Sequence, residues 1–133
     1  IQPTVLADVS NDMRVAREEI FGPVLAVIKY KTVEEAIDLA NDTDYGLSAG
    51  IWTSDLVRAQ QLARDLRAGS IWVNDWHMMR TDAPFGGYKQ SGYGRELGRH
   101  SIDAYVETKA VSMSFERKPH KKAMQRIVHT QMA

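Results

Sequence analysis

Residues 75–98 combine glycines with large apolar side chains. Of the whole sequence, this segment has the residue types best suited to binding a ligand or another chain. Five of the nine glycines fall within residues 86–98. Six large apolar residues are interleaved with them or precede them, namely Trp76, Met78, Met79, Phe85, Tyr88 and Tyr93. Glycine permits close backbone approach, so this composition indicates a loop that closely approaches a ligand or another chain. An irregular connection packed by its own aromatic rings would have the same composition, and both interpretations stay open.

A second candidate is the carboxylate pair Glu18-Glu19, which precedes Phe21 and a tight turn at Gly22-Pro23. By itself this pattern also fits an exposed helix end beside a core phenylalanine.

Several other chemistries lack the residues they need. The sequence has no cysteine, which excludes a disulfide scaffold, a cysteine zinc site and a thiol nucleophile supplied by this chain. Its four histidines show no metal-ligand spacing, so no metal is expected. The glycines at residues 92–98 are spaced one residue too widely for a dinucleotide fingerprint. Ser91 and Ser101 have no base beside them in sequence, which argues against a serine triad.

The composition is that of an ordinary globular domain. The chain has 133 residues, of which 44% are hydrophobic and 26% charged, which fits one domain with a modest core. No apolar run approaches the roughly 20 residues of a membrane span. The residues from Ile1 onward lack the basic and apolar regions of a signal peptide. We therefore expect a cytoplasmic protein with no membrane contact.

The net charge of zero hides an uneven distribution. Residues 117–133 carry five basic residues and no acid, which leaves 12 basic against 17 acidic residues in 1–116. Such a tail can attract an anionic partner, although a solvated or docked extension is the simpler explanation. Five charges are a weak nucleic-acid signal, and no nucleic acid is expected.

Apolar runs and helix signals alternate between residues 23 and 74. Three runs rich in β-branched residues predict strands at 23–28, 47–52 and 70–74. The first of these strands is expected to be buried on both faces. The helix after it should begin at Thr32, with Glu35 completing a capping box. The next helix is expected to have Ser54 as its N-cap and Gly69 as its C-cap glycine.

This order of strands and helices is typical of βαβ units, so we predict an α/β fold with a parallel sheet. Only two crossover helices lie in the stretch, and part of the cover for the sheet must come from elsewhere. A short helix is expected at 95–102. Residues 105–115 alternate like a strand and, with no later partner, should pair with a neighbouring subunit.

Four segments carry a family resemblance, and they occur in the family's order. They read EEIFGPV at 18–24, N-x-x-x-Y-G-L at 41–47, GSIWVN at 69–74 and PFGGYKQSGYGRE at 84–96. Together they resemble the C-terminal portion of the aldehyde dehydrogenase superfamily. The resemblance implies parallel βαβ units of the catalytic domain at 1–103, an oligomerisation strand at 104–116 and a basic C-terminal tail at 117–133.

The family chemistry needs groups that this sequence does not contain. In that family a cysteine thiolate attacks the aldehyde, hydride passes to NAD or NADP, and a glutamate activates the water that releases the acid. The resemblance places these groups, an oxyanion-holding asparagine and the phosphate-binding half upstream of Ile1. We therefore assign no catalytic residue here and expect the 133-residue chain alone to be inactive.

The resemblance assigns cofactor contacts to three residues. Glu19 aligns with the carboxylate that binds the nicotinamide-side ribose, since two neighbouring hydroxyls can both donate to its oxygens. Phe21 aligns with the aromatic residue beside the same ribose, and Leu47 with an apolar contact near the nicotinamide.

Substrate contacts are assigned in the same way. Phe85, Met79 and Trp76 align with the aldehyde tunnel, whereas plain core packing is the alternative role for each. The implied partners are an aldehyde and further copies of the subunit. Two other functions stay open, namely a non-enzymatic module that joins related subunits through its late strand, and a binder of anionic surfaces that uses the basic tail.

Overall fold

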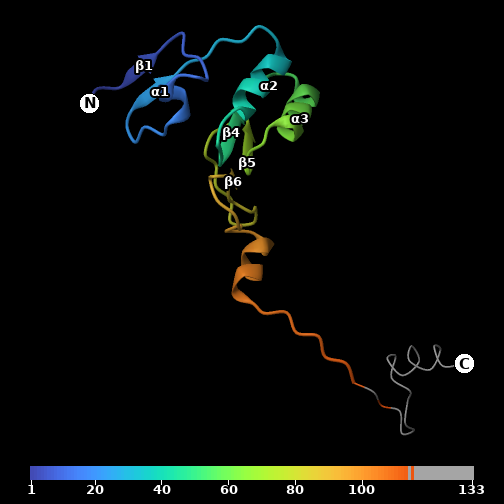
Figure 1. Cartoon of the computed structure of the whole chain (residues 1–133). Coiled ribbons are helices and arrows are strands. Elements are labelled where there is room, and N and C mark those ends of the chain that lie inside the picture. Colours follow the sequence, from blue (N-terminus) through green and yellow to red (C-terminus); the bar gives the residue numbers. More distant parts are fainter. Residues whose placement is uncertain (114, 116–133) are drawn as a thin grey trace, which may run out of the picture.

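The computed structural model describes residues 1–113 and 115, whose strands form three two-stranded sheets (Figure 1). The parallel pairs are β1 (Thr4–Leu6) with β2 (Val24–Ala26) and β4 (Ser48–Ile51) with β5 (Ser70–Val73). An antiparallel pair joins β3 (Tyr45–Gly46) to β6 (Tyr88–Lys89). The chain is therefore α/β in content, as predicted.

The strand expected at 23–28 forms, but its surroundings differ from the prediction. It appears as β2, which pairs in parallel with β1. The short helix α1 (Arg14–Arg17) lies between these two strands in the chain. Leu25 in its centre is 60% exposed, so burial on both faces is wrong for this chain. Of the described strands, only β1 pairs with β2, and neither contains a buried residue.

Helix α2 (Val33–Asn41) begins as the sequence predicts. The Thr32 side chain accepts a hydrogen bond from the backbone N–H of Glu35 at 3.2 Å. The Glu35 carboxylate accepts from the backbone N–H of Lys31 at 2.6 Å. Thr32 is therefore confirmed as the N-cap. The Glu35 carboxylate caps the backbone N–H of Lys31, whereas a standard capping box would use the N–H of Thr32.

A βαβ unit is formed by β4, helix α3 (Leu56–Asp65) and β5, which lie side by side in Figure 1. Asp55, not Ser54, caps α3, because its carboxylate accepts from the N–H of Arg58 at 2.9 Å. Gly69 is not the C-cap glycine, since α3 ends at Asp65 and Gly69 lacks a positive φ. A Cβ at Gly69 would collide with the Gly86 carbonyl, so close backbone approach requires glycine there.

The predicted single parallel sheet is divided. Strands β2 and β4 flank α2 and β3 in the chain but join different pairs, because β2 takes the earlier β1 as its partner. The two parallel pairs are therefore separate sheets among the described residues.

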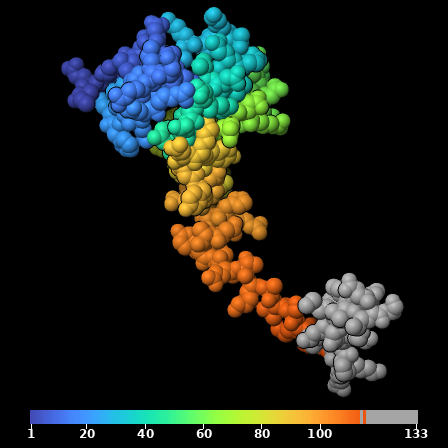
Figure 2. Space-filling model, viewed as in Figure 1, coloured from blue at the N-terminus to red at the C-terminus, as the bar shows by residue number. Residues whose placement is uncertain are grey.

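The late segment adopts no strand within the described residues. A 3-10 helix, η1 (Arg99–Tyr105), covers only residues 99–102 of the short helix expected at 95–102 and extends to Tyr105. Residues 106–113 and 115 are exposed and have no ladder partner in the described part of the chain. Figures 1 and 2 show this orange segment leaving the compact body. Residues 105–113 and 115 therefore join no sheet of the described chain, their predicted pairing with a neighbouring subunit stays a prediction, and residues 117–133 lie outside the described residues.

Burial is slight across the described structure. Its buried hydrophobic residues are Val9, Ile51 and Ala59, whereas large side chains such as Phe21 and Trp52 stay 94% and 65% exposed. No helix among the described residues has the length and apolar character needed to cross a membrane.

Candidate functional site

The first candidate site is a hollow of about 340 Å³ that joins three distant segments. Glu19 follows α1, Leu47 lies between β3 and β4, and Ser91 follows β6, and all three line it. The hollow therefore combines a carboxylate, a hydroxyl and an apolar wall. Phe21 does not line it, and its 94% exposed side chain stands clear of the body.

The charges around this hollow are largely paired, with one exception. Arg14 donates to Glu18 at 2.7 and 2.9 Å and lowers the pKa of that carboxyl. Arg17 donates to Asp42 at 2.8 and 3.1 Å and, as the largest cause, lowers its pKa. No hydrogen bond or ion pair occupies the Glu19 carboxylate within the described residues. Glu19 is thus the acceptor at this hollow that is free for a ligand.

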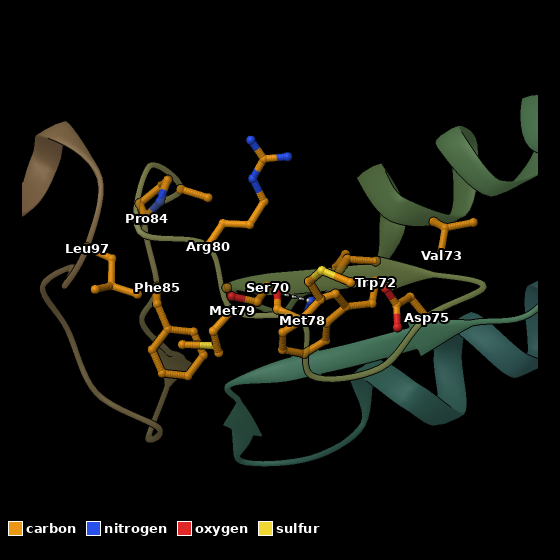
Figure 3. A pocket seen from close by; sticks show the side chains of 13 residues that line it. Ser70, Trp72, Val73, Asp75, Met78, Met79, Arg80, Pro84, Phe85 and Leu97 are labelled. Atoms are coloured by element: carbon orange, nitrogen blue, oxygen red, sulfur yellow. Dashed lines mark hydrogen bonds between the residues drawn. The ribbon is translucent and has the colours of Figure 1, made fainter.

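A second hollow, of about 500 Å³, lies beside the carboxyl end of β5 (Figure 3). Met79 and Phe85 line it together with Met78, Asp75 and Arg80. The wall is mostly apolar, with charged groups at two positions. It can therefore hold an apolar body whose polar end faces outward.

Trp76 is not part of that lining but belongs to an aromatic cluster beside it. Its ring lies 5.3 Å from Trp72 in an edge arrangement and 6.4 Å from Trp52, measured between centroids. The Trp72 Nε1–H donates to the Met78 carbonyl at 3.0 Å and ties the cluster to the hollow. Trp76 is 54% exposed, so half of its surface is available for a contact.

A third hollow, of about 890 Å³, connects these two regions. It shares Leu47 and Ser91 with the Glu19 hollow, and Phe85 and Leu97 with the Met79 hollow. Four of the six predicted site residues thus line adjoining hollows, and Trp76 packs against Trp72 in the wall of one of them. Phe21 stands apart.

An asparagine sets the direction of the chain into the second hollow. Asn74 has a φ of 55°, in the left-handed region that asparagine tolerates better than most residues. Its amide accepts from the N–H of Thr53 and donates to the carbonyl of Thr53, both at 2.8 Å. This pair of bonds fixes the turn from β5 into residues 75–79, which carry Trp76 and Met79.

The family model for the aldehyde dehydrogenase family matches residues 1–111. The chain belongs to this family. It is 48% identical over 118 residues to the mitochondrial aldehyde dehydrogenase of Homo sapiens, covering 89% of this chain and 23% of that protein. It is 49% identical over 116 residues to the putative aldehyde dehydrogenase DhaS of Bacillus subtilis, covering 87% and 23%.

Solved aldehyde dehydrogenases have the same backbone arrangement. An NAD+ complex from Bacillus cereus superimposes with a TM-score of 0.85 at 47% identity, over 87% of this chain and 24% of that chain. An NAD+ complex from Mycobacterium tuberculosis gives 0.83 at 44% identity, over 90% and 24%. The predicted family is confirmed, and the chain spans about a quarter of the length of these relatives.

A lysine locks two parts of this aldehyde dehydrogenase chain together. The Lys89 Nζ donates to the carbonyls of Asn41 and Thr43 at 2.6 and 2.9 Å. The last turn of α2 has no basic residue of its own, so Lys89 supplies the positive charge that a helix C-terminus favours. Ser91 Oγ accepts from the N–H of Gly46 at 3.0 Å. These bonds hold Leu47 and Ser91 on the same hollow.

Replacing Lys89 should loosen this junction. We expect Lys89→Met to speed amide exchange at Gly46 and Gln90 and to lower the free energy of unfolding by about 1.5–3 kcal/mol, the contribution of bonds to a charged group. Hydrogen exchange and denaturant unfolding measure both effects. Lys31→Met, which removes an exposed lysine, is the matched control. Equal exchange in the two variants would show that Lys89 does not hold the junction.

Sequence reasoning missed Asn74 and Lys89 as positioning groups and Asp75 and Arg80 as pocket walls. The position of Asn74 just after a strand is a usable signal for a turn. Nothing in the sequence joins Lys89 to α2, since the two lie 48 residues apart. No group of three or more metal-binding side chains occurs within the described residues.

Proposed function

We propose that the chain is the C-terminal part of an aldehyde dehydrogenase that uses NAD or NADP to oxidise an aldehyde to a carboxylic acid. The free Glu19 carboxylate on a hollow shared with Leu47 is the observation that supports it most. The related structures from Bacillus cereus and Mycobacterium tuberculosis are complexes with NAD+, which favours this cofactor. In the reaction the aldehyde is oxidised, the cofactor takes up a hydride, and water supplies the second oxygen.

The residues around the Glu19 hollow fit the nicotinamide half of such a cofactor. Glu19 can accept from both hydroxyls of a ribose, because its two oxygens have no other partner in the described structure. Leu47 offers an apolar surface for a flat ring, and Phe21 would close over the same ribose. When bound, the cofactor supplies the hydride acceptor, and these residues orient it.

The Met79 hollow fits the aldehyde. Met79 and Phe85 are apolar and adaptable walls, and Trp76 presents a ring next to them. They would bind an aromatic or alkyl substituent and exclude water from the reacting carbonyl. None of these side chains can attack a carbonyl, so the chain contributes binding and orientation, while the nucleophile must come from residues outside this sequence.

Glu19 carries the clearest test of this function. In an enzyme containing these residues, Glu19→Gln should slow hydride transfer about 10- to 100-fold, because hydrogen bonds to a charged group contribute roughly 1.5–3 kcal/mol. Single-turnover formation of the reduced cofactor measures this step. Glu18→Gln is the control, since that carboxylate is already paired with Arg14. An unchanged rate in Glu19→Gln would reject the role of Glu19.

We also propose that residues 104–116 pair with a strand of another subunit. Val106 has extended backbone angles, and the apolar side chains of Val111, Met113 and Phe115 are 67%, 73% and 90% exposed. An exposed apolar segment of this kind needs a partner.

A further inference from the structure

An ion pair stands at the edge of the Met79 hollow. Arg80 lines this hollow, and its Nε and Nη2 donate to the two carboxylate oxygens of Asp82 at 2.9 and 2.7 Å. This bidentate contact lowers the pKa of Asp82, so both groups are charged near neutral pH. Figure 3 shows the Arg80 guanidinium directed away from Met79 and Phe85. The ion pair therefore holds the positive head group away from the apolar wall.

A second acidic group of the hollow has no such partner. Asp75 also lines the hollow, and its carboxylate accepts from the backbone N–H of Trp76 at 2.7 Å. Within residues 1–113 and 115, no basic side chain forms an ion pair with Asp75. The other residues that line the hollow are uncharged. Because the charges of Arg80 and Asp82 cancel, Asp75 leaves this region negative.

We propose that the Met79 hollow accepts aldehydes with an uncharged substituent and disfavours those that carry a carboxylate, and that the Arg80–Asp82 ion pair determines this preference. An anionic substituent would meet the like charge of Asp75 and an apolar wall at Met79 and Phe85, where an unpaired charge is costly. The identity of the ligand as an aldehyde rests on the proposed function, whereas the preference for an uncharged ligand needs no turnover.

Asp82 is the residue whose replacement should change this preference. Asp82→Asn keeps the size of the side chain and removes the charge that holds Arg80. The freed guanidinium can then turn toward the hollow and pair with a carboxylate on the ligand. Both side chains of the ion pair are 67% exposed, so solvent screening keeps the expected gain modest.

The kinetic test compares 4-methylbenzaldehyde with 4-carboxybenzaldehyde in an enzyme containing these residues. Asp82→Asn should raise kcat/KM for the carboxylate aldehyde, relative to the neutral one, about three- to fivefold. The gain should fade in about 1 M salt, because exposed charges are screened there. Asp8→Asn is the matched control, since it breaks the exposed ion pair with Lys29 and does not line this hollow. It should keep the parental ratio.

A double variant shows whether the gain depends on Arg80. Arg80→Gln combined with Asp82→Asn should return the ratio close to its parental value, because no positive charge remains to pair with the carboxylate. An unchanged ratio in Asp82→Asn, or an equal gain in the double variant, would overturn the inference.

Ligand binding by the full 133-residue chain separates this inference from the proposed function. Trp72 lines the hollow, and its Nε1–H gives an NMR signal that reports a bound ligand without turnover. The probes are two unreactive alcohols, 4-methylbenzyl alcohol and 4-(hydroxymethyl)benzoate. The parent chain should bind the neutral alcohol more tightly, and Asp82→Asn should narrow the difference, whereas equal binding of both alcohols by the parent would contradict the inference.

The two readouts can fail independently. The expected binding preference, found with an enzyme that oxidises no aldehyde, would support the inference and count against the proposed function. Oxidation of both aldehydes with no change of ratio in Asp82→Asn would support the proposed function and overturn the inference.

Discussion

The purified 133-residue chain should form no reduced cofactor when incubated with NAD+ or NADP+ and a panel of aldehydes. The sequence contains no cysteine, so it cannot supply the thiolate that attacks the aldehyde. Without a covalent intermediate, the cofactor contacts proposed for Glu19 and Leu47 would orient a cofactor but could not deliver hydride to it. The expected effect is complete loss relative to a full-length relative.

Absorbance of the reduced cofactor measures this outcome directly. The Bacillus cereus enzyme assayed in the same buffer serves as the positive control. Turnover that scales with the amount of the chain and persists after repurification would contradict the assignment of the nucleophile to residues outside this sequence.

Val111→Pro should disrupt the assembly of an oligomeric enzyme that contains residues 104–116. Proline removes one backbone donor from the strand ladder and restricts its own φ. We expect subunits to dissociate or aggregate, because the segment's exposed apolar side chains would lose their partner. Light scattering reports the mass of the particle.

Val111→Thr is the matched control for this variant, since threonine keeps both the β-branched shape and the backbone N–H. It should retain the parental mass. If Val111→Pro also kept that mass and its activity at low concentration, the segment would not hold subunits together.

Local signals predicted the start of α2 correctly. Thr32 and Glu35 lie three residues apart, and their capping bonds depend only on that spacing. For α3 the sequence predicts a cap one residue too early, because Ser54 and Asp55 are both good caps and only the geometry shows which side chain reaches the N–H three residues on.

Non-local pairing escaped prediction. The pattern at 23–28 indicates a strand but does not show that β1 is its partner or that Leu25 faces solvent in this chain. A continuous apolar run predicts a strand that is buried in the folded protein. It does not show which segments of the fold cover that strand. The strand expected at 105–115 likewise depends on a distant partner, and within the described residues this segment joins no sheet.

The site was predictable only in part. The resemblance supplied Glu19, Leu47, Met79 and Phe85, and the structure brings them onto adjoining hollows. The bonds that create this arrangement, from Lys89 to the end of α2, join residues far apart in sequence. Neither the periodicity of apolar residues nor the spacing of a motif predicts a contact between residues so far apart, so only the structure could show it.

A structure of an enzyme containing residues 1–111, with NAD+ bound, tests the central claim most directly. We predict that both hydroxyls of the nicotinamide-side ribose lie within about 2.5–3.0 Å of the Glu19 carboxylate oxygens, the normal range for O–H···O bonds. Leu47 should contact the nicotinamide ring. A bound cofactor whose ribose is held by other residues, with Glu19 turned to solvent, would contradict the account.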